Sequence, residues 1–188
     1  MQNKKSMDVR TIVAIGLMAA LVFIFSKFRI DIPSPLGKTG IHFGNIMCLL
    51  GGLLFGAVPG GLAAGIGSAL LDLTDPVYAP EFWITFLTKF AMGFVAGWLG
   101  RQAALQGRRV MVWVAAAAGS LTYVVLYGLK NILMGHFVQG FTWAAAIGET
   151  MTLKVPVSVG NGIIAVICAA LLAMALAPSL HKAHLLEQ

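Results

Sequence analysis

The sequence predicts an all-α integral membrane protein, a compact six-helix transmembrane bundle that forms a single domain over 1–188. Hydrophobic residues make up 59% of the 188 residues and charged residues only 11%, whereas a soluble domain usually carries about 25% charged residues. A spanning helix needs about 20 apolar residues, so the chain holds about six spans and no separate soluble domain. The net charge of +6 does not indicate a nucleic-acid partner, because the basic residues lie mostly at the ends of hydrophobic runs.

The first predicted helix covers about 11–28, a long apolar run. Lys27 and Arg29 follow it at the place where a signal peptide would carry small residues for cleavage. We therefore expect the run to be retained as a membrane helix. Prolines and glycines are frequent in the next stretch, 29–41, and they predict an irregular loop.

The second and third predicted helices cover about 42–55 and 59–73. A tight turn that begins at Gly56 separates them. Pro59 suits the first turn of the third helix, because an N–H at that position has no intrahelical partner to lose.

The last three helices are predicted at about 82–99, 110–134 and 152–177. An acidic, aromatic loop precedes the first of them and a basic loop follows it. The connection over 135–150 is expected to be partly helical. Pro156 predicts a kink near the start of the last helix, because proline removes one backbone hydrogen bond.

The distribution of charge predicts the orientation in the membrane. Six spans place both termini on the same side as the turn at Gly56 and the loop after 82–99. Cytoplasmic loops carry an excess of Lys and Arg, and this side collects Lys4, Lys5, Arg10, Arg101, Arg108, Arg109 and Lys182. Both termini are therefore predicted to be cytoplasmic.

Small residues occur at helical spacing in the third and fourth predicted helices. Gly61 and Gly65 are four residues apart, and so are Gly93 and Gly97. Small residues let membrane helices approach closely. We interpret both pairs as packing positions inside the bundle rather than as a dedicated dimer interface.

Polar residues inside the predicted spans gather toward the outer face of the membrane. Ionisable groups in hydrocarbon are costly and normally face a cavity, a partner or the interface. The inner halves of the last three helices are almost purely apolar. This pattern predicts a pocket open to the outside, with candidate substrate-binding residues Asn45, Thr85, Lys89, Tyr127, Lys130, Asn131, Lys154 and Asn161.

Each candidate also has a simpler interpretation. Lys130 and Lys154 lie near helix ends and could extend to the lipid headgroups. Asn131 and Asn161 could make hydrogen bonds between helices. Lys89 lies about two turns inside its helix, which favours a cavity. Aromatic residues on the same side form an interfacial belt in the simple reading, and a few of them could stack on a flat, polar ligand.

Neither a catalytic nor a metal site is predicted. The sequence has no G-x-S-x-G, H-E-x-x-H or Walker motif. Cys48 and Cys168 lie inside apolar runs without the spacing of metal ligands. The inner half also lacks a chain of carboxylates for a proton relay, which argues against an ion-coupled pump.

Three stretches resemble one transporter family. Gly16-x-x-x-Ala20 resembles the small-residue motif of that family's first helix, although Gly replaces the usual Ala. The stretch 45–72, with Leu-Leu-Phe-Gly-Ala-Val-Pro-Gly-Gly at 53–61, is similar to its helix-turn-helix, and 89–93 to its fourth helix. Over nearly its whole length the chain resembles the S components of energy-coupling factor (ECF) vitamin transporters.

The resemblance implies a function and a set of partners. An S component binds a vitamin or related micronutrient from outside, in the cell membrane of a prokaryote. Its first helix, here through Gly16 and Ala20, contacts a membrane coupling (T) subunit. Two cytoplasmic ATPase subunits use the ATP, so the resemblance implies no covalently bound cofactor and no catalysis by this chain. The vitamin cannot be assigned from the sequence.

Two other functions are compatible with a small membrane bundle that has a polar pocket. One is a self-sufficient, ion-coupled secondary transporter or channel, which would take up solute into liposomes on its own. The other is a membrane-embedded enzyme acting on a lipid or isoprenoid, which would show turnover. The absence of a recognisable nucleophile or metal cluster in the sequence makes the enzyme the weakest of the three.

Overall fold

The computed structural model describes residues 8–34 and 37–182. Most of the chain is helical, as the sequence predicts. The elements in order are α1 (Val9–Lys27), β1 (Arg29–Ser34), β2 (Gly37–His42), α2 (Gly44–Phe55), α3 (Ala57–Asp72), a short 3-10 turn (Ala79–Glu81), α4 (Phe82–Leu105), α5 (Arg109–Phe137), α6 (Trp143–Glu149), a π-helical turn (Thr150–Lys154) and α7 (Val155–Lys182). The six-helix membrane bundle is confirmed, with α6, the π-helical turn and α7 forming its last helix.

The helices differ in length. Within the described residues, 4 are long and apolar enough to cross a membrane: α1, α4, α5 and the continuous run from Trp143 to Lys182. Helices α2 and α3 have only 12 and 16 residues. At 1.5 Å per residue they extend about 18 and 24 Å, which is less than the roughly 30 Å hydrocarbon core. By length alone, each of these two helices is shorter than that core.

The stretch predicted as an irregular loop is an antiparallel β-hairpin. Arg29 pairs with His42 and Asp31 with Gly40. The alternation of Ile30 and Ile32 with polar neighbours is the β signal, and the prolines and glycines around it concealed that signal. His42 consequently ends β2, and the second helix begins at Gly44 rather than at position 42.

The last helix differs from the prediction in a similar way. It begins as α6, well before position 152, and a π-helical turn joins it to α7. Pro156 directly follows this turn and cannot donate the usual backbone hydrogen bond. The widened turn therefore takes the place of the predicted kink. Helix α4 also runs beyond position 99 to Leu105, so Arg101 lies in a helix rather than in a loop.

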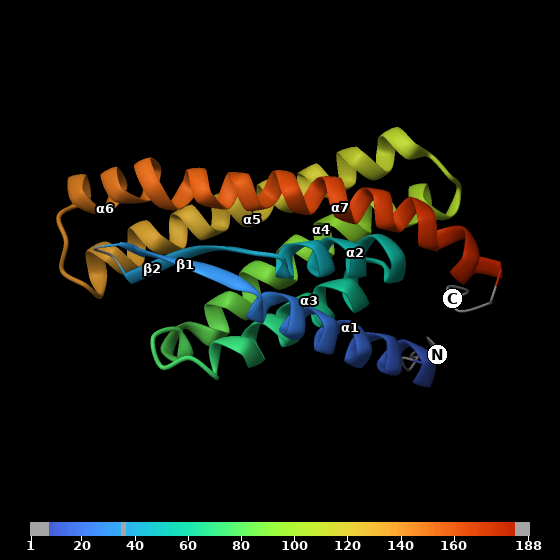
Figure 1. The fold of residues 1–188 in the computed structure, drawn as a ribbon, viewed down its shortest axis with the longest axis horizontal. Helices are drawn as coiled ribbons and strands as arrows, with labels where there is room; N and C mark the ends of the chain where they lie inside the picture. Colours follow the sequence, from blue (N-terminus) through green and yellow to red (C-terminus); the bar gives the residue numbers. More distant parts are fainter. Residues whose placement is uncertain (1–7, 35–36, 183–188) are drawn as a thin grey trace, which may run out of the picture.

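The two ends of the bundle carry different elements. Figure 1 shows the hairpin and α6 at one end, and the start of α1 and the end of α7 at the other. The second end also holds the turns between α2 and α3 and between α4 and α5, as the six-pass prediction requires. Lys4 and Lys5 lie outside the described residues. We call the two ends the hairpin end and the terminal end.

Glycine brings α2, α3 and α4 into close contact. A Cβ atom on Gly93 would lie 2.7 Å from the carbonyl oxygen of Gly60, and Gly60 itself packs against Gly52. Gly61 and Gly65 pack against Phe90 and Phe86 of α4. These glycines therefore pack within the bundle, as predicted, because the helix backbones approach too closely for a side chain.

Candidate functional site

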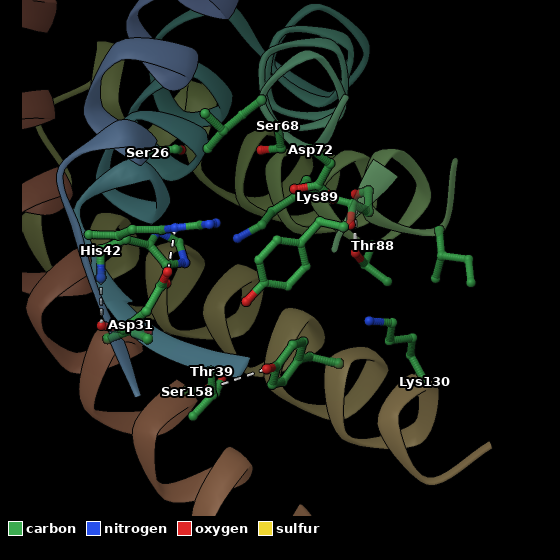
Figure 2. A pocket seen from close by; sticks show the side chains of 18 residues that line it. Ser26, Asp31, Thr39, His42, Ser68, Asp72, Thr88, Lys89, Lys130 and Ser158 are labelled. Carbon is green, nitrogen blue, oxygen red and sulfur yellow. Dashed lines mark hydrogen bonds and ion pairs between the residues drawn. The ribbon is translucent and has the colours of Figure 1, made fainter. Parts of the chain in front are cut away.

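A cavity of about 100 Å³ lies near the hairpin end. Its volume is several times the roughly 10–15 Å³ that one buried water needs. Side chains from α1, both strands, α3, α4, α5 and α7 line it (Figure 2). The polar lining residues are Ser26, Arg29, Asp31, Thr39, His42, Ser68, Asp72, Tyr78, Thr85, Thr88, Lys89, Tyr127, Lys130, Ser158 and Asn161.

The structure brings five of the eight candidate binding residues to this cavity. Thr85, Lys89, Tyr127, Lys130 and Asn161 line it. The remaining three, which are Asn45, Asn131 and Lys154, lie behind the lining residues and bond to them or to each other.

Lys89 is buried, with 5% of its surface exposed. Its ammonium group donates a hydrogen bond to Oδ1 of Asn45 and lies 3.7 Å from the centre of the Tyr123 ring. A cation over an aromatic face is stabilised electrostatically. Asn45 is fully buried, and among the described residues its Nδ2 has no hydrogen-bond partner. Lys89 is therefore held by neutral groups.

The other two lysine candidates have different surroundings. Lys130 forms an ion pair with Glu81, from the turn that precedes α4. Lys154 is buried and donates to Oδ1 of Asn131 over 2.9 Å, and Asn131 in turn donates to the carbonyl oxygen of Tyr127 over 2.7 Å. Lys154 and Asn131 thus link α5 to the π-helical turn, which matches the interhelical role considered for Asn131.

Side chains of α5 and α7 hold the hairpin over the cavity. Nδ2 of Asn161 donates to the carbonyl oxygen of Gly40 over 2.7 Å, and its Oδ1 accepts from the backbone N–H of His42 over 3.3 Å. The hydroxyl groups of Thr39 and Tyr127 lie 3.3 Å apart. Both polar atoms of the Asn161 amide are therefore used by the hairpin.

A second set of contacts ties the hairpin to the loop between α3 and α4. Arg29 forms ion pairs with Asp31 at 3.0 Å and with Asp75 at 2.5 Å. Its guanidinium group also lies 4.7 Å from the centre of the Tyr78 ring. Burial raises the pKa of Tyr78, so this phenol stays neutral at physiological pH. Sequence reasoning did not select Arg29 or Tyr78, because their roles depend on how two turns meet.

Two polar atoms of the cavity lack partners. Among the described residues, Nδ1 of His42 and Oγ of Ser158 are buried without a hydrogen bond. Leaving such a group unsatisfied costs about 1–3 kcal/mol. Burial, followed by the nearby charges of Lys89 and Arg29, lowers the pKa of His42 to about 3, so its imidazole is neutral. Neither His42 nor Ser158 was among the binding residues predicted from the sequence.

The predicted partner surface lies on α1. Gly16 and Ala20 are exposed, and nothing lies within 4 Å of a Cβ atom placed on Gly16. Ile12, Leu17 and Ile24 are exposed around them. In the described part of the chain, no group of three or more His, Cys, Asp or Glu residues is placed to hold a metal ion.

Comparisons with known proteins identify the family of this chain. The model of the family described as ECF-type riboflavin transporter, S component, matches residues 6–178. A UPF0397 protein of Lactiplantibacillus plantarum is 31% identical over 159 residues, which cover 77% of this chain and 84% of that protein. A UPF0397 protein of Enterococcus faecalis is 34% identical over 103 residues, 55% of each chain.

A solved structure has the same fold. The S component of a bacterial ECF transporter superposes with a TM-score of 0.65, at 19% sequence identity, over 91% of this chain and 97% of the other. S components are multi-pass membrane proteins that serve transport rather than catalysis. They bind a small molecule and associate with a T subunit and ATPase subunits. Since the family model covers nearly the whole sequence, this chain belongs to the ECF-type riboflavin transporter S-component family, the substrate-binding membrane subunits of ECF importers.

Proposed function

We propose that this chain captures a vitamin or related micronutrient from outside the cell, with high affinity, in the cavity near the hairpin end. One observation carries the proposal. Polar side chains from both strands and five helices converge on a single cavity, where His42 and Ser158 present buried atoms without partners among the described residues. Concave sites with a few convergent polar groups are typical of small-molecule binding.

The proposed side of binding follows from charge. Arg10, Arg101, Arg108, Arg109 and Lys182 belong to the terminal end of the bundle. With these residues in the cytoplasm, the hairpin and the cavity beneath it face outward.

Riboflavin is the first solute to test, because the family model carries its name. Tyr78 and Tyr127 line the cavity and offer aromatic faces to a flat ring. Binding is measured as quenching of riboflavin fluorescence by the purified protein, together with mass spectrometry of small molecules that co-purify with it. Failure to retain any solute would contradict the proposal.

Substitution of Lys89 tests the location of the site. Lys89→Met removes the ammonium group and keeps a side chain of similar length, so we expect the affinity for the retained solute to fall about tenfold or more. Arg109→Gln, at the terminal end, is the control and leaves the affinity unchanged. An unaltered Kd for Lys89→Met in a folded protein would place the solute elsewhere.

We propose that Gly16 and Ala20 contact the T subunit, which in turn joins two cytoplasmic ATPase subunits that use ATP. Replacing both residues with Leu would cover the exposed small-residue surface, so the variant retains solute binding but does not co-purify with the T subunit. Ala117→Leu, at an exposed position of α5, is the matched control and preserves the complex.

Reconstitution distinguishes a subunit from a self-sufficient carrier. In the proposed mechanism, liposomes that contain this chain alone take up no solute under a proton or sodium gradient. Uptake without the partner subunits would instead support an ion-coupled secondary transporter.

A further inference from the structure

The cations that line the cavity differ in whether a carboxylate neutralises them. Arg29 pairs with Asp31 and Asp75, and Lys130 pairs with Glu81. Lys89 also lines the cavity, yet within residues 8–34 and 37–182 it forms no ion pair. Among the cationic lining residues, Lys89 is therefore the one whose charge is not neutralised by a carboxylate of the described residues.

Asp72 is the counterpart of Lys89 among the acids. It lines the cavity with 9% of its surface exposed, and it too has no ion pair with a described residue. The side chain of Thr85 bonds to its carboxylate, and the positive charge of Lys89 also favours the ionised carboxylate. Figure 2 shows Asp72 and Lys89 next to each other, with the amino end of Lys89 directed toward the middle of the pocket.

These two groups set opposite requirements for a solute. Lys89 donates hydrogen bonds and Asp72, when ionised, only accepts them. A carboxylate or phosphate placed between them would attract Lys89 but repel Asp72, and a cationic solute would meet the reverse problem. Burying an additional unpaired charge is costly. An uncharged group with an acceptor next to a donor satisfies both side chains.

A ring amide has this arrangement, because its C=O and N–H lie side by side on a rigid edge. We infer that Asp72 and Lys89 form the specificity-determining pair of the cavity, and that they select an uncharged heterocycle through an amide edge, with Lys89 donating to the C=O and Asp72 accepting from the N–H. The inference rests on the proposed solute-binding function and assigns its substrate class.

The rest of the cavity agrees with an uncharged solute. The unpartnered atoms of His42 and Ser158 belong to a neutral imidazole and a hydroxyl group. They can exchange hydrogen bonds with hydroxyl or carbonyl groups of the solute and add no charge. Arg29 and Lys130 are already neutralised, so they do not require an anionic substituent.

The test compares three probes on the wild-type protein and two variants. Riboflavin carries a ring N–H between two carbonyl groups, and N3-methylriboflavin lacks only that donor. Riboflavin 5′-phosphate keeps the donor and adds an anion elsewhere. We expect the wild type to bind riboflavin at least about tenfold more tightly than the N3-methyl compound, since the hydrogen bond to a charged acceptor is lost. We expect riboflavin 5′-phosphate to bind no more tightly than riboflavin.

The variants identify the residues. Asp72→Ala lowers the affinity for riboflavin about tenfold or more and changes that for N3-methylriboflavin less than about threefold, so the preference disappears. Lys89→Met weakens both compounds, because both keep the carbonyl acceptors. Arg109→Gln, which removes a cation at the terminal end and away from the cavity lining, changes neither by more than about threefold. Folding does not confound the result for Asp72→Ala, because a misfolded variant would lose both probes equally. For Lys89→Met, a melting temperature in detergent close to that of the wild type shows that the variant is folded.

A wider panel separates failure of this inference from failure of the proposed function. Thiamine carries a positive charge and pantothenate a carboxylate, and we expect neither to be retained. Retention of one of them without any uncharged ring amide would overturn the inference while leaving solute capture in place. Equal affinity for riboflavin and its N3-methyl derivative, or unchanged affinity in both Asp72→Ala and Lys89→Met, would also overturn it. Retention of no solute at all would contradict the proposed function, and this inference with it.

Discussion

The hairpin end and the terminal end of this bundle are held together by different interactions. Near the hairpin end, buried Lys, Asn, Asp, Ser and Thr side chains bond across elements. Toward the terminal end the core is built from alanine, valine and other apolar residues, including Ala103, Val112, Ala173 and Ala177. Packed methyl groups have no alternative partners, whereas hydrogen-bonding groups can exchange one partner for a solute. In the proposed function, the hairpin end therefore binds the solute and the terminal end provides a tightly packed support.

The largest effect is expected from disturbing the close packing. In Gly93→Val the added side chain would meet the backbone of Gly60, where even a Cβ atom would lie at 2.7 Å. Overpacking of this kind costs about 1–3 kcal/mol or more, so we expect a clear fall in melting temperature in detergent. Gly148→Val is the control, because nothing lies within 4 Å of a Cβ atom there. Similar melting temperatures for the two variants would contradict the packing comparison.

The next effect concerns the attachment of the hairpin. Asn161→Ala removes both hydrogen bonds between this side chain and β2. At about 1 kcal/mol each, their loss is expected to increase solute release by about tenfold and to accelerate amide hydrogen exchange over 37–42. Thr122→Ala, which removes a hydroxyl bonded within its own helix, leaves both rates unchanged. Unaltered exchange in Asn161→Ala would show that other contacts hold the hairpin.

A smaller effect is expected from the ion pairs of Arg29. Its partners are partly exposed, and such pairs contribute at most about 1 kcal/mol. Arg29→Gln is therefore expected to raise the rates of solute binding and release by up to about fivefold, as measured by stopped-flow fluorescence. High salt is expected to bring the binding and release rates of the wild type closer to those of the variant. Lys27→Gln, which alters an exposed neighbouring lysine, has no effect on either rate. A wild type insensitive to salt would rule out a contribution of these pairs.

A separate effect is a pH dependence of stability. Burial lowers the pKa of His42 from its ordinary value of 6.5 to about 3 in the folded protein. Between pH 3 and pH 6.5, His42 therefore binds more protons in the unfolded chain than in the folded protein. His42 therefore makes its full contribution to stability above about pH 6.5, and that contribution declines as the pH falls toward 3. We expect the melting temperature to fall between pH 7 and 5, and His42→Gln to reduce the slope. An equal slope in the variant would exclude His42 as the cause.

The sequence predicted the helices well because hydrophobic runs broken by glycine and proline are local features. It missed the hairpin, because the two strands are short and rich in the residues that usually mark loops. It also identified the helix over 42–55 from its hydrophobicity, but it did not show that nearly all of that helix is buried by the rest of the chain. The amino-acid pattern does not distinguish burial in lipid from burial in protein.

The sequence predicted how deep in the bundle the candidate site lies, but not which contacts its residues make. Depth along each helix is set by spacing, so Thr85, Lys89, Tyr127 and Asn161 were found. Partner choice depends on tertiary contacts, and the sequence did not show that Lys130 is paired with Glu81 while Lys89 has no ion pair among the described residues. Asp72 was not among the binding residues predicted from the sequence.

Helix α2 has a further consequence for the behaviour of this protein in membranes. All but one of its 12 residues are buried by the rest of the chain, so its surroundings resemble the centre of a soluble protein. Changes in bilayer thickness or lipid composition act on the surfaces that touch lipid, and α2 contributes almost none of that surface. The centre of the bundle is therefore insulated from the membrane that surrounds it, and the geometry around Asn45 and Lys89 is expected to be the same in thin and thick bilayers.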